Sequence, residues 1–108
     1  MTIKAGEIWV ANIPFTNGMS SKKRPVLVLW IDGSDAIVAL VTSALPRTQT
    51  DVILNDWERI GLRVASTVRL SRLDCLEQSL LFSKLGTISQ ADAAQIREVW
   101  QFYIKLQF

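Results

Sequence analysis

Three cations in a row, Lys22, Lys23 and Arg24, stand directly before Pro25 and an apolar run that ends at Trp30. A proline keeps the residue before it out of helical conformations, so Arg24 is expected to be extended and held by a rigid neighbour. A guanidinium held in this way can bind a phosphate through two parallel hydrogen bonds. The pattern therefore indicates either a phosphate site around Arg24 or a charged loop that only solvates the start of a buried strand.

Two hydroxyl residues, Thr42 and Ser43, close the next apolar run, residues 36–42. The Asp-Gly-Ser-Asp sequence of residues 32–35 predicts a hairpin between the two runs. Thr42 and Ser43 are then one hairpin away from Arg24. Their hydroxyls can donate hydrogen bonds to a phosphoryl oxygen, or they can satisfy backbone groups where the strand stops. The same two interpretations apply to the serines that precede the cations.

A second polar cluster, Arg69, Ser71, Arg72 and Asp74, lies on and after the predicted strand of residues 64–70. Side chains alternate along a strand, which puts Arg69 and Ser71 on one face for as long as the strand lasts. An arginine beside an aspartate can equally be a surface ion pair, which contributes little stability. The cluster is therefore a candidate binding region only in combination with other features.

Composition excludes several classes of protein and site. The 108 residues, of which 49% are hydrophobic, are enough for one folded domain with its own core. The chain has one cysteine and no histidine, so no cysteine- or histidine-rich metal site is expected. With no histidine to activate it, Cys75 is expected to be a small buried apolar residue. The sequence shows no signal peptide, and its apolar runs are far shorter than the about 20 residues that a membrane-spanning helix needs. This favours a soluble, cytoplasmic protein.

Most of the chain has the pattern of β-strands. Asn55 is expected to cap a helical turn that ends at Gly61. The region 73–85 is ambiguous between a short strand and a turn, followed by a last strand. Strands are expected at residues 7–13, 25–30, 36–42, 51–54, 64–70 and 83–87.

The last part of the chain has the spacing of a helix. Ser89 and Asp92 have the spacing of a capping box. The residues that follow form an apolar stripe typical of core packing, made of Ala93, Ile96, Val99, Trp100, Tyr103 and Leu106. The sequence thus predicts a mainly β fold, a small and strongly bent antiparallel sheet or barrel, closed by a C-terminal α-helix.

These blocks together resemble the MazF/PemK (Kid) family of toxins from bacterial type II toxin–antitoxin modules. The likeness begins with GEIWVANIPF, continues in GMSSKKRPVLVLW and AIVALVTS, and runs through GLRVASTVRL and KLGTIS to the terminal helix. It covers nearly the whole chain, with the blocks in order and at sensible spacing. The resemblance implies one domain over residues 1–108 with the fold of an SH3-like small β-barrel and a C-terminal α-helix.

The resemblance also implies an activity. Family members are metal-independent endoribonucleases (mRNA interferases) that cleave single-stranded RNA, leaving a 2′,3′-cyclic phosphate and a 5′-hydroxyl. Their catalytic arginine before proline and the threonine that closes the following strand fall on Arg24 and Thr42. An arginine on the later strand, used by several members, falls on Arg69. RNA contacts are therefore expected from Ser20, Ser21, Lys22, Lys23, Ser43, Arg69 and Ser71.

The general base and the partners follow less directly. Arg24 is a poor base because its pKa lies far above neutral, so the base is expected to be Glu7, Asp74 or a water molecule. By family resemblance, the partners are a cognate antitoxin protein and a second copy of the chain in a homodimer. The antitoxin is expected to lay an acidic peptide over Arg24. No cofactor is expected.

Two alternatives remain open. Met19, Ser20 and Ser21 stand where many relatives have an acidic–glutamine pair or a histidine, and Ser71 stands where some have an acidic residue. These departures favour a catalytically weakened barrel that binds RNA or a peptide. The other alternative is a gyrase-directed toxin, since the gyrase poison CcdB shares this barrel. That toxin needs a terminal tryptophan, whereas residues 101–108 here read QFYIKLQF.

Overall fold

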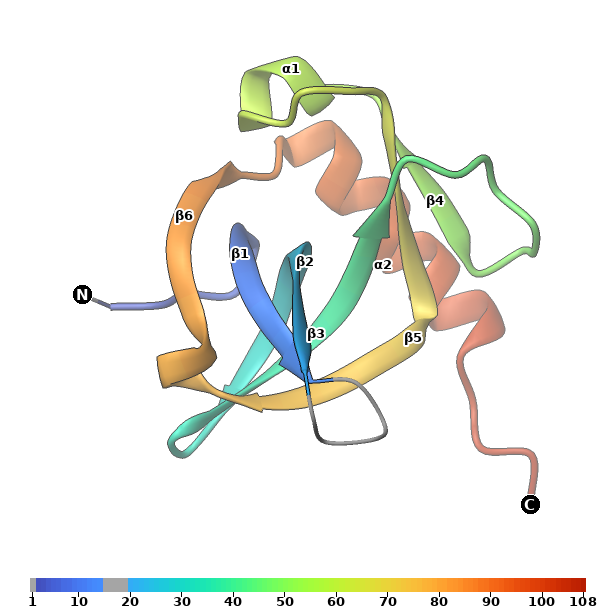
Figure 1. Cartoon of the computed structure of the whole chain (residues 1–108). Coiled ribbons are helices and arrows are strands. Elements are labelled where there is room, and N and C mark those ends of the chain that lie inside the picture. Colours follow the sequence, from blue (N-terminus) through green and yellow to red (C-terminus); the bar gives the residue numbers. More distant parts are fainter. Residues whose placement is uncertain (1, 15–19) are drawn as a thin grey trace.

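A computed structural model describes residues 2–14 and 20–108 of the chain. Six strands among these residues form one antiparallel sheet in the order β4-β5-β3-β2-β1-β6, and a C-terminal helix packs against it (Figure 1). The mainly β fold with a C-terminal α-helix is therefore confirmed. In chain order the elements are β1 (Glu7–Pro14), β2 (Ser21–Asp32), β3 (Asp35–Thr42), β4 (Asp51–Leu54), α1 (Trp57–Ile60), β5 (Ser66–Glu77), the 3-10 helix η1 (Gln78–Leu80), β6 (Leu81–Thr87) and α2 (Gln90–Tyr103).

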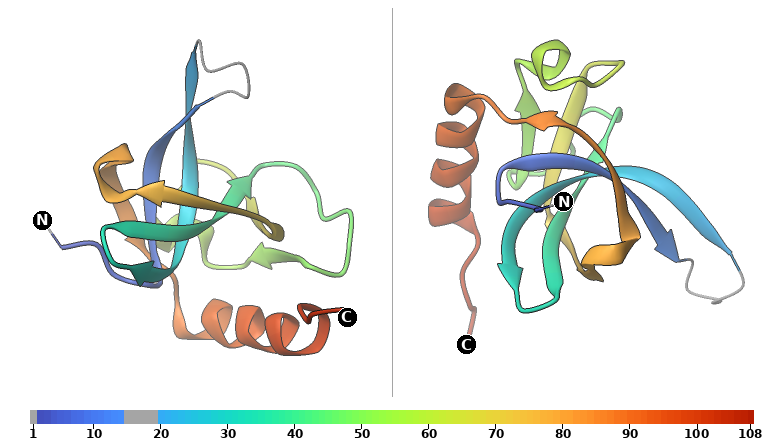
Figure 2. Two further views of the ribbon diagram at one scale, coloured as in Figure 1. Left: turned by 90° about the horizontal axis from the view of Figure 1, so that it is seen from below. Right: turned by 90° about the vertical axis from the view of Figure 1, so that its left-hand side faces the viewer.

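Strand β2 begins earlier than its apolar run indicates. The three cations are part of the strand and pair with β1, with Lys22, Lys23 and Arg24 opposite Ile13, Asn12 and Ala11. This end of the β1–β2 pair extends beyond the rest of the sheet (Figure 2, left). The expected hairpin between β2 and β3 is present, and Asp32 lies opposite Asp35 at its turn.

Strand β5 is longer than predicted and bends sharply. Arg69 pairs with Leu40 of β3, but the next paired residue, opposite Ala39, is Leu73. Residues 70–72 are thus unpaired and form a three-residue bulge, at which β5 bends before it continues to Glu77. The ambiguous region is therefore the second half of β5, then η1, then β6. Since a bulge changes which side chains face inward, alternation read from the sequence fails beyond Arg69.

This shift also corrects the expectation for Cys75. The thiol is exposed, and it is the neighbouring Leu76 that is buried. Partial desolvation and the nearby carboxylates, Asp35 first, raise the pKa of the Cys75 thiol. Its sulfur lies 3.7 Å from Asp35 Oδ2, across the β3–β5 pair.

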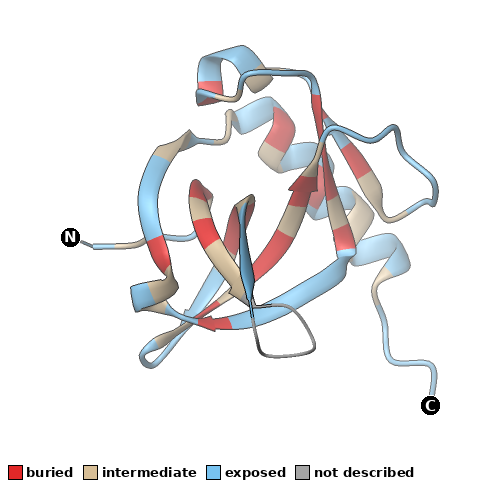
Figure 3. Cartoon of the chain, viewed as in Figure 1, coloured by how far each residue is buried: buried red, intermediate tan, exposed pale blue. Residues whose placement is uncertain are grey.

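Buried residues recur along the strands of the curved sheet (red in Figure 3). Their side chains form two separate clusters. Leu27 belongs to the cluster that α2 covers through Ile96. Its neighbour Val26 belongs to the other cluster, which Leu81 of β6 helps to close. Burial on both faces explains why the run in β2 is continuously apolar. Each such side chain contributes about 1.5–3 kcal/mol when fully buried.

The sheet is barrel-like, and a backbone contact bridges its two edge strands. No strand pairing among the described residues joins β4 to β6. Instead α1, which follows β4, packs against β6 so closely that a Cβ on Gly86 would lie 1.9 Å from the carbonyl oxygen of Ile60. A Cβ on Gly61 would lie 2.5 Å from that of Leu85. The sheet is therefore not closed by strand pairing, but the fold is barrel-like, and two glycines let the main chains of α1 and β6 touch.

Helix α2 is anchored to α1 by a buried carboxylate. Ser89 caps α2 as predicted, its hydroxyl accepting a hydrogen bond from the Asp92 N–H at 3.1 Å. The fully buried carboxylate of Asp92 does not complete the capping box. It accepts hydrogen bonds from the backbone N–H groups of Asn55 and Asp56, at 3.0 and 3.1 Å. The predicted cap of α1 by Asn55 is wrong, because the N-cap is Asp56 and its side chain makes no capping bond.

The apolar stripe on α2 is shorter than predicted. Ile96 is buried, but Tyr103 is 46% exposed and Leu106 is 78% exposed. The helix ends at Tyr103, so helical spacing no longer applies to Leu106. Among the helices of the described residues, none has the length and apolar character that crossing a membrane requires.

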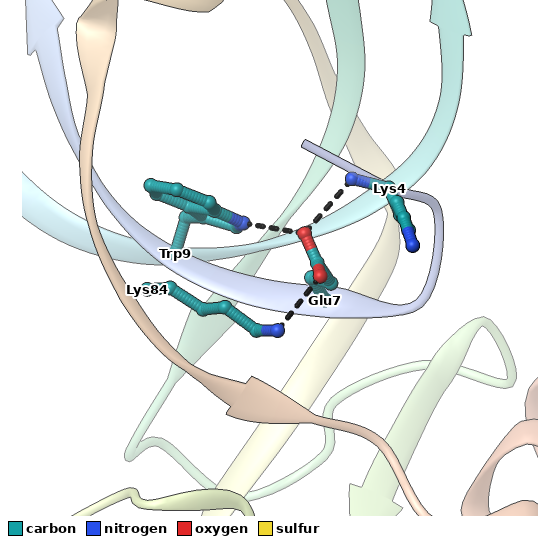
Figure 4. Close-up of polar contacts among 4 residues, drawn as sticks. All are labelled: Lys4, Glu7, Trp9 and Lys84. Carbon is teal, nitrogen blue, oxygen red and sulfur yellow. Dashed lines mark hydrogen bonds and ion pairs between the residues drawn. The ribbon is translucent and has the colours of Figure 1, made fainter. Parts of the chain in front are cut away.

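Glu7 is a buried acid held by three donors (Figure 4). Its Oε1 accepts hydrogen bonds from the Trp9 indole N–H at 3.0 Å and from the Lys4 backbone N–H at 2.8 Å. Its Oε2 lies 2.8 Å from the Lys84 ammonium on β6. Burial raises the pKa of the Glu7 carboxyl, but Lys84 and the two N–H donors outweigh it, so the net pKa is lowered. The ionised carboxylate therefore stabilises the junction of β1 and β6.

This pKa shift predicts how stability depends on pH. A carboxyl with a lowered pKa contributes stability above its unfolded value, and loses it as the pH falls through the folded value. Glu7→Gln should lower the free energy of unfolding at neutral pH by about 1–3 kcal/mol. It should also flatten the loss of stability on acidification, which begins near the unfolded carboxyl pKa and continues as the pH falls through the lowered folded pKa. Urea unfolding of both proteins across this range measures the effect; parallel pH curves would contradict it.

Candidate nucleic-acid interface

Strand register brings Arg24 and Thr42 to adjacent positions. Val26 of β2 lies opposite Leu40 of β3. Two residues further in the same register, position 24 comes opposite position 42, although the pairing of the two strands ends at Val26. Because side chains two apart on a strand point to the same face, Arg24 and Thr42 share the face of Val26 and Leu40.

Arg69 joins this face from the next strand. Thr42 is the pairing partner of Thr67 on β5, and Leu40 is the partner of Arg69. Directly opposite residues in an antiparallel pair project to the same side of the sheet. The sheet therefore places Arg24, Thr42 and Arg69 on one face, at the end of the buried cluster that contains Val26. Arg24 and Thr42 are half-buried, which limits their freedom but leaves them accessible.

The hydroxyl of Thr42 fits both interpretations given above. Its Oγ1 accepts a hydrogen bond from the Ala44 backbone N–H at 3.2 Å, so it does satisfy a backbone group where β3 ends. This bond uses an oxygen lone pair and leaves the hydroxyl hydrogen able to turn toward an anion. The local bond thus orients Thr42 without preventing donation to a phosphate.

The two lysines lie on opposite faces of β2. Lys22, two residues before Arg24, shares its face. Lys23 projects to the other side, where its Nζ lies 5.1 Å from the centre of the Phe82 ring. Lys22 can therefore contact the same bound phosphate backbone as Arg24, while Lys23 can do so only across the protruding end of β2.

The predicted serines are dispersed, and all are exposed. Ser21 begins β2 and Ser20 directly precedes it, and Ser43 follows Thr42 where β3 ends. Ser71 lies in the bulge of β5 and has no pairing partner on β3. The loop in which this chain departs from its relatives also includes residues 18 and 19, which lie outside the described residues.

Neither candidate carboxylate base lies beside Arg24 and Thr42. Asp74 is opposite Val38, four positions from Thr42, which corresponds to about 13 Å at about 3.3 Å per residue. Glu7 lies four positions from Ala11, the pairing partner of Arg24 on β1, and its carboxylate forms an ion pair with Lys84.

A cavity of about 800 Å³ lies away from this face, against α2. Its lining residues include Trp30, Arg97 and Trp100.

Three residues of this face were missed by sequence reasoning. Thr67 is the partner of Thr42, Ile53 is the partner of Thr67, and Asp51 is the partner of Arg69. All three therefore lie on the face of Arg24 and Thr42. Their positions depend on the pairing of β4 with β5, and no local sequence pattern reveals that register.

Comparisons with known proteins agree with this fold. The model of a family described as PemK-like, MazF-like toxin of type II toxin–antitoxin system matches residues 4–102. A search of curated proteins finds no match. Among solved structures, an endoribonuclease in complex with its cognate antitoxin from a mycobacterial species is 13% identical, with a TM-score of 0.78 over 99% of each chain. A MazE–MazF structure from Deinococcus radiodurans is 20% identical, with a TM-score of 0.73 over 94% of this chain and 95% of that one.

Proposed function

This chain belongs to the family of PemK-like, MazF-like toxins of type II toxin–antitoxin systems, and from that premise we propose that it is an endoribonuclease. It cleaves single-stranded RNA, and the 2′-hydroxyl of the RNA is the nucleophile. The products are a 2′,3′-cyclic phosphate and a 5′-hydroxyl, and no metal takes part. The observation that carries the proposal is the placement of Arg24, Thr42 and Arg69 on one accessible face.

The chemistry requires orientation, charge stabilisation and two proton transfers. The 2′-oxygen attacks the adjacent phosphorus, a pentavalent phosphorane forms, and the bond to the 5′-oxygen breaks. The guanidinium of Arg24 binds the non-bridging oxygens, whose charge grows in the phosphorane, and Thr42 donates a hydrogen bond to one of them. The 2′-hydroxyl loses its proton to water, because Glu7 and Asp74 lie too far away. The departing 5′-oxygen takes a proton from Arg24 or from solvent.

The remaining predicted residues bind the RNA. Lys22 and Arg69 contact phosphates on the catalytic face, and Lys23 contacts the backbone where it crosses the end of β2. Ser20, Ser21, Ser43 and Ser71 are exposed at strand ends and at the bulge, where hydroxyls can donate to RNA oxygens. Such contacts make binding weaken as salt concentration rises.

The partners follow from family membership. The mycobacterial and Deinococcus relatives are described in complex with a cognate antitoxin or with MazE. We propose that this chain forms a homodimer in the bacterial cytoplasm and is held inactive by an antitoxin. An acidic segment of that antitoxin covers the face of Arg24 and competes with RNA for the same cations.

The direct test is to incubate the purified chain with single-stranded RNA in excess EDTA and to analyse the products. The expected result is cleavage at a limited set of sites, with cyclic-phosphate ends. RNA that stays intact would overturn the proposal. The distance of both carboxylates from Arg24 favours a second candidate, an RNA-binding barrel without catalysis. Tight RNA binding with no cleavage product would identify that case.

A further inference from the structure

The protruding end of the β1–β2 pair carries cations on both of its faces. Among the described residues, β2 pairs with β3 only as far as Val26, and β1 pairs with β6 only as far as Ala11. Beyond these points the described part of β1 and β2 is a ribbon without a third strand (Figure 2, left). Arg24 lies on one face of β2 and Lys23 on the other. An RNA strand bound at Arg24 can therefore pass round the edge of β2 to the face of Lys23.

Phe82 is an exposed aromatic residue beside this second face. Its neighbours Leu81 and Ser83 pair with consecutive residues of β1, so Phe82 itself is bulged and has no partner on that strand. A bulge changes the direction in which a side chain points. Leu81 is buried, whereas Phe82 is 42% exposed, and the centre of its ring lies 5.1 Å from the Lys23 Nζ. The bulge thus presents an aromatic ring to solvent next to a cation.

Phe82 is near enough to Arg24 for one RNA strand to reach both. Ala11 pairs with Arg24 on β2 and with Leu81 on β6, so these three residues form one row across the sheet. Because neighbouring strands lie about 4.8 Å apart, the row spans about 10 Å. Phe82 follows Leu81 directly. A strand with one phosphate at Arg24 can therefore place a base a few nucleotides away over the Phe82 ring.

The contact between Lys23 and Phe82 is weaker than the stacking that can replace it. A cation over an exposed aromatic ring changes an equilibrium constant by about two- to fivefold. A base stacked on an aromatic side chain changes the affinity for a single strand by about 5- to 150-fold. Lys23 is exposed, so its flexible side chain can leave the ring. The ring is then free to stack on a base, and the ammonium group can move to a phosphate beside it.

We propose that Phe82 and Lys23 form a stacking site for a base of the bound RNA, on the face of β2 opposite Arg24. Phe82 stacks on the base, and Lys23 contacts an adjacent phosphate. Because every base has a π-face, the site adds affinity without selecting a sequence. The site rests on the proposed function, since it assumes that RNA binds at Arg24.

Phe82→Leu is the sharpest variant. Leucine keeps an apolar side chain in the bulge but has no flat ring to stack on a base. Phe82→Trp restores an aromatic face and should rescue binding. Phe102→Ala is the matched control, because it removes another exposed phenyl ring, from α2. Urea unfolding of each variant verifies that it folds.

The first experiment measures binding to a single strand of 2′-O-methyl RNA, which has no free 2′-hydroxyl and therefore stays intact. Fluorescence anisotropy gives the affinity at several salt concentrations. Phe82→Leu should bind about fivefold or more weakly than wild type. Phe82→Trp and Phe102→Ala should bind within twofold of wild type. If Phe82→Leu binds as tightly as Phe102→Ala, the stacking site is overturned.

The salt dependence separates stacking from an indirect effect on the lysine. Lys23→Ala removes one phosphate contact, so the slope of log affinity against log salt concentration should become shallower by about 0.7. Phe82→Leu should leave the wild-type slope unchanged. If Phe82→Leu makes the slope shallower as Lys23→Ala does, the ring only positions Lys23, and the stacking site is overturned.

A second experiment locates the stacked base. An abasic residue is placed in turn at each position of the shortest strand that binds with full affinity. At one position it should weaken binding by wild type as much as Phe82→Leu does, and it should weaken binding by Phe82→Leu no further. Losses that add at every position would contradict the stacking site.

These outcomes distinguish the stacking site from the nuclease function. If RNA is cleaved but Phe82→Leu binds like the control, the stacking site fails and the nuclease function stands. If Phe82→Leu weakens binding as expected but no RNA is cleaved, the nuclease function fails and the stacking site stands. A wild-type protein that binds no single-stranded RNA would overturn both.

Discussion

Arg24→Ala is expected to lower kcat for RNA cleavage by about 100- to 1,000-fold, as removal of one donor to a developing anion does in other enzymes. The guanidinium meets charge that appears only in the phosphorane, so its loss should affect kcat more than KM. The proline that follows Arg24 and the pairing of Arg24 with Ala11 remain in the variant. The measurement is the single-turnover rate on saturating RNA.

Two related variants and one control make the result specific. Arg24→Lys keeps the charge but loses the planar fork, so it should recover only part of the rate. Thr42→Val removes one hydroxyl at nearly constant volume and should cost about 10- to 100-fold. Arg59→Ala removes an exposed cation from α1 and should leave the rate unchanged. If Arg24→Ala cleaves as fast as Arg59→Ala, then Arg24 is not catalytic.

Gly86→Ala should destabilise the fold by about 3 kcal/mol or more, a large share of the about 5–15 kcal/mol that stabilises a domain of this size. The added methyl group would lie 1.9 Å from the Ile60 carbonyl oxygen and 2.8 Å from its carbon. Both obstructing atoms belong to the backbone, so no side chain can rotate away. The contact between α1 and β6 must open, and the barrel-like closure with it. Urea unfolding at neutral pH measures the loss.

Gly33→Ala is the matched control for this effect. Gly33 has a φ of +62°, in the left-handed region, but an added Cβ would meet nothing within 4 Å. The variant should therefore lose only the about 1–2 kcal/mol of left-handed backbone strain. If Gly86→Ala unfolds at the same urea concentration as Gly33→Ala, the backbone contact does not hold the sheet closed.

Much of the site could be predicted because its parts are close in sequence. The Asp-Gly-Ser-Asp turn sets an antiparallel hairpin between β2 and β3, which brings Arg24 near Thr42 without long-range information. The strand runs and the Ser89 cap were equally local; the structure confirms the cap and a strand at each predicted run, although β2 and β5 extend beyond their predicted bounds. Family resemblance then added the later arginine, which the pairing of Leu40 with Arg69 places on the same face.

The rest depends on contacts between distant segments. The bulge at residues 70–72 moves every later side chain of β5, which is why Cys75 is exposed rather than buried. Asp92 has the spacing of a capping box, yet its carboxylate binds the backbone before α1, a partner that helix rules do not consider. Asp51 and Ile53 reach the face of Arg24 and Thr42 through the pairing of β4 with β5. Glu7 was a candidate base until Lys84 and Trp9 showed that its role is structural.

The central claim is that Arg24 and Thr42 act on a phosphate attacked by the RNA's own 2′-hydroxyl. The most direct test uses two oligonucleotides that differ by one atom, all-ribose RNA and the same strand with a single 2′-deoxy nucleotide before the scissile phosphate. In EDTA, the account predicts that the first is cut to a 2′,3′-cyclic phosphate and a 5′-hydroxyl, and that the second is bound but not cut there. Cleavage of the deoxy-substituted strand at that bond would contradict the account, since no 2′-hydroxyl is present to attack.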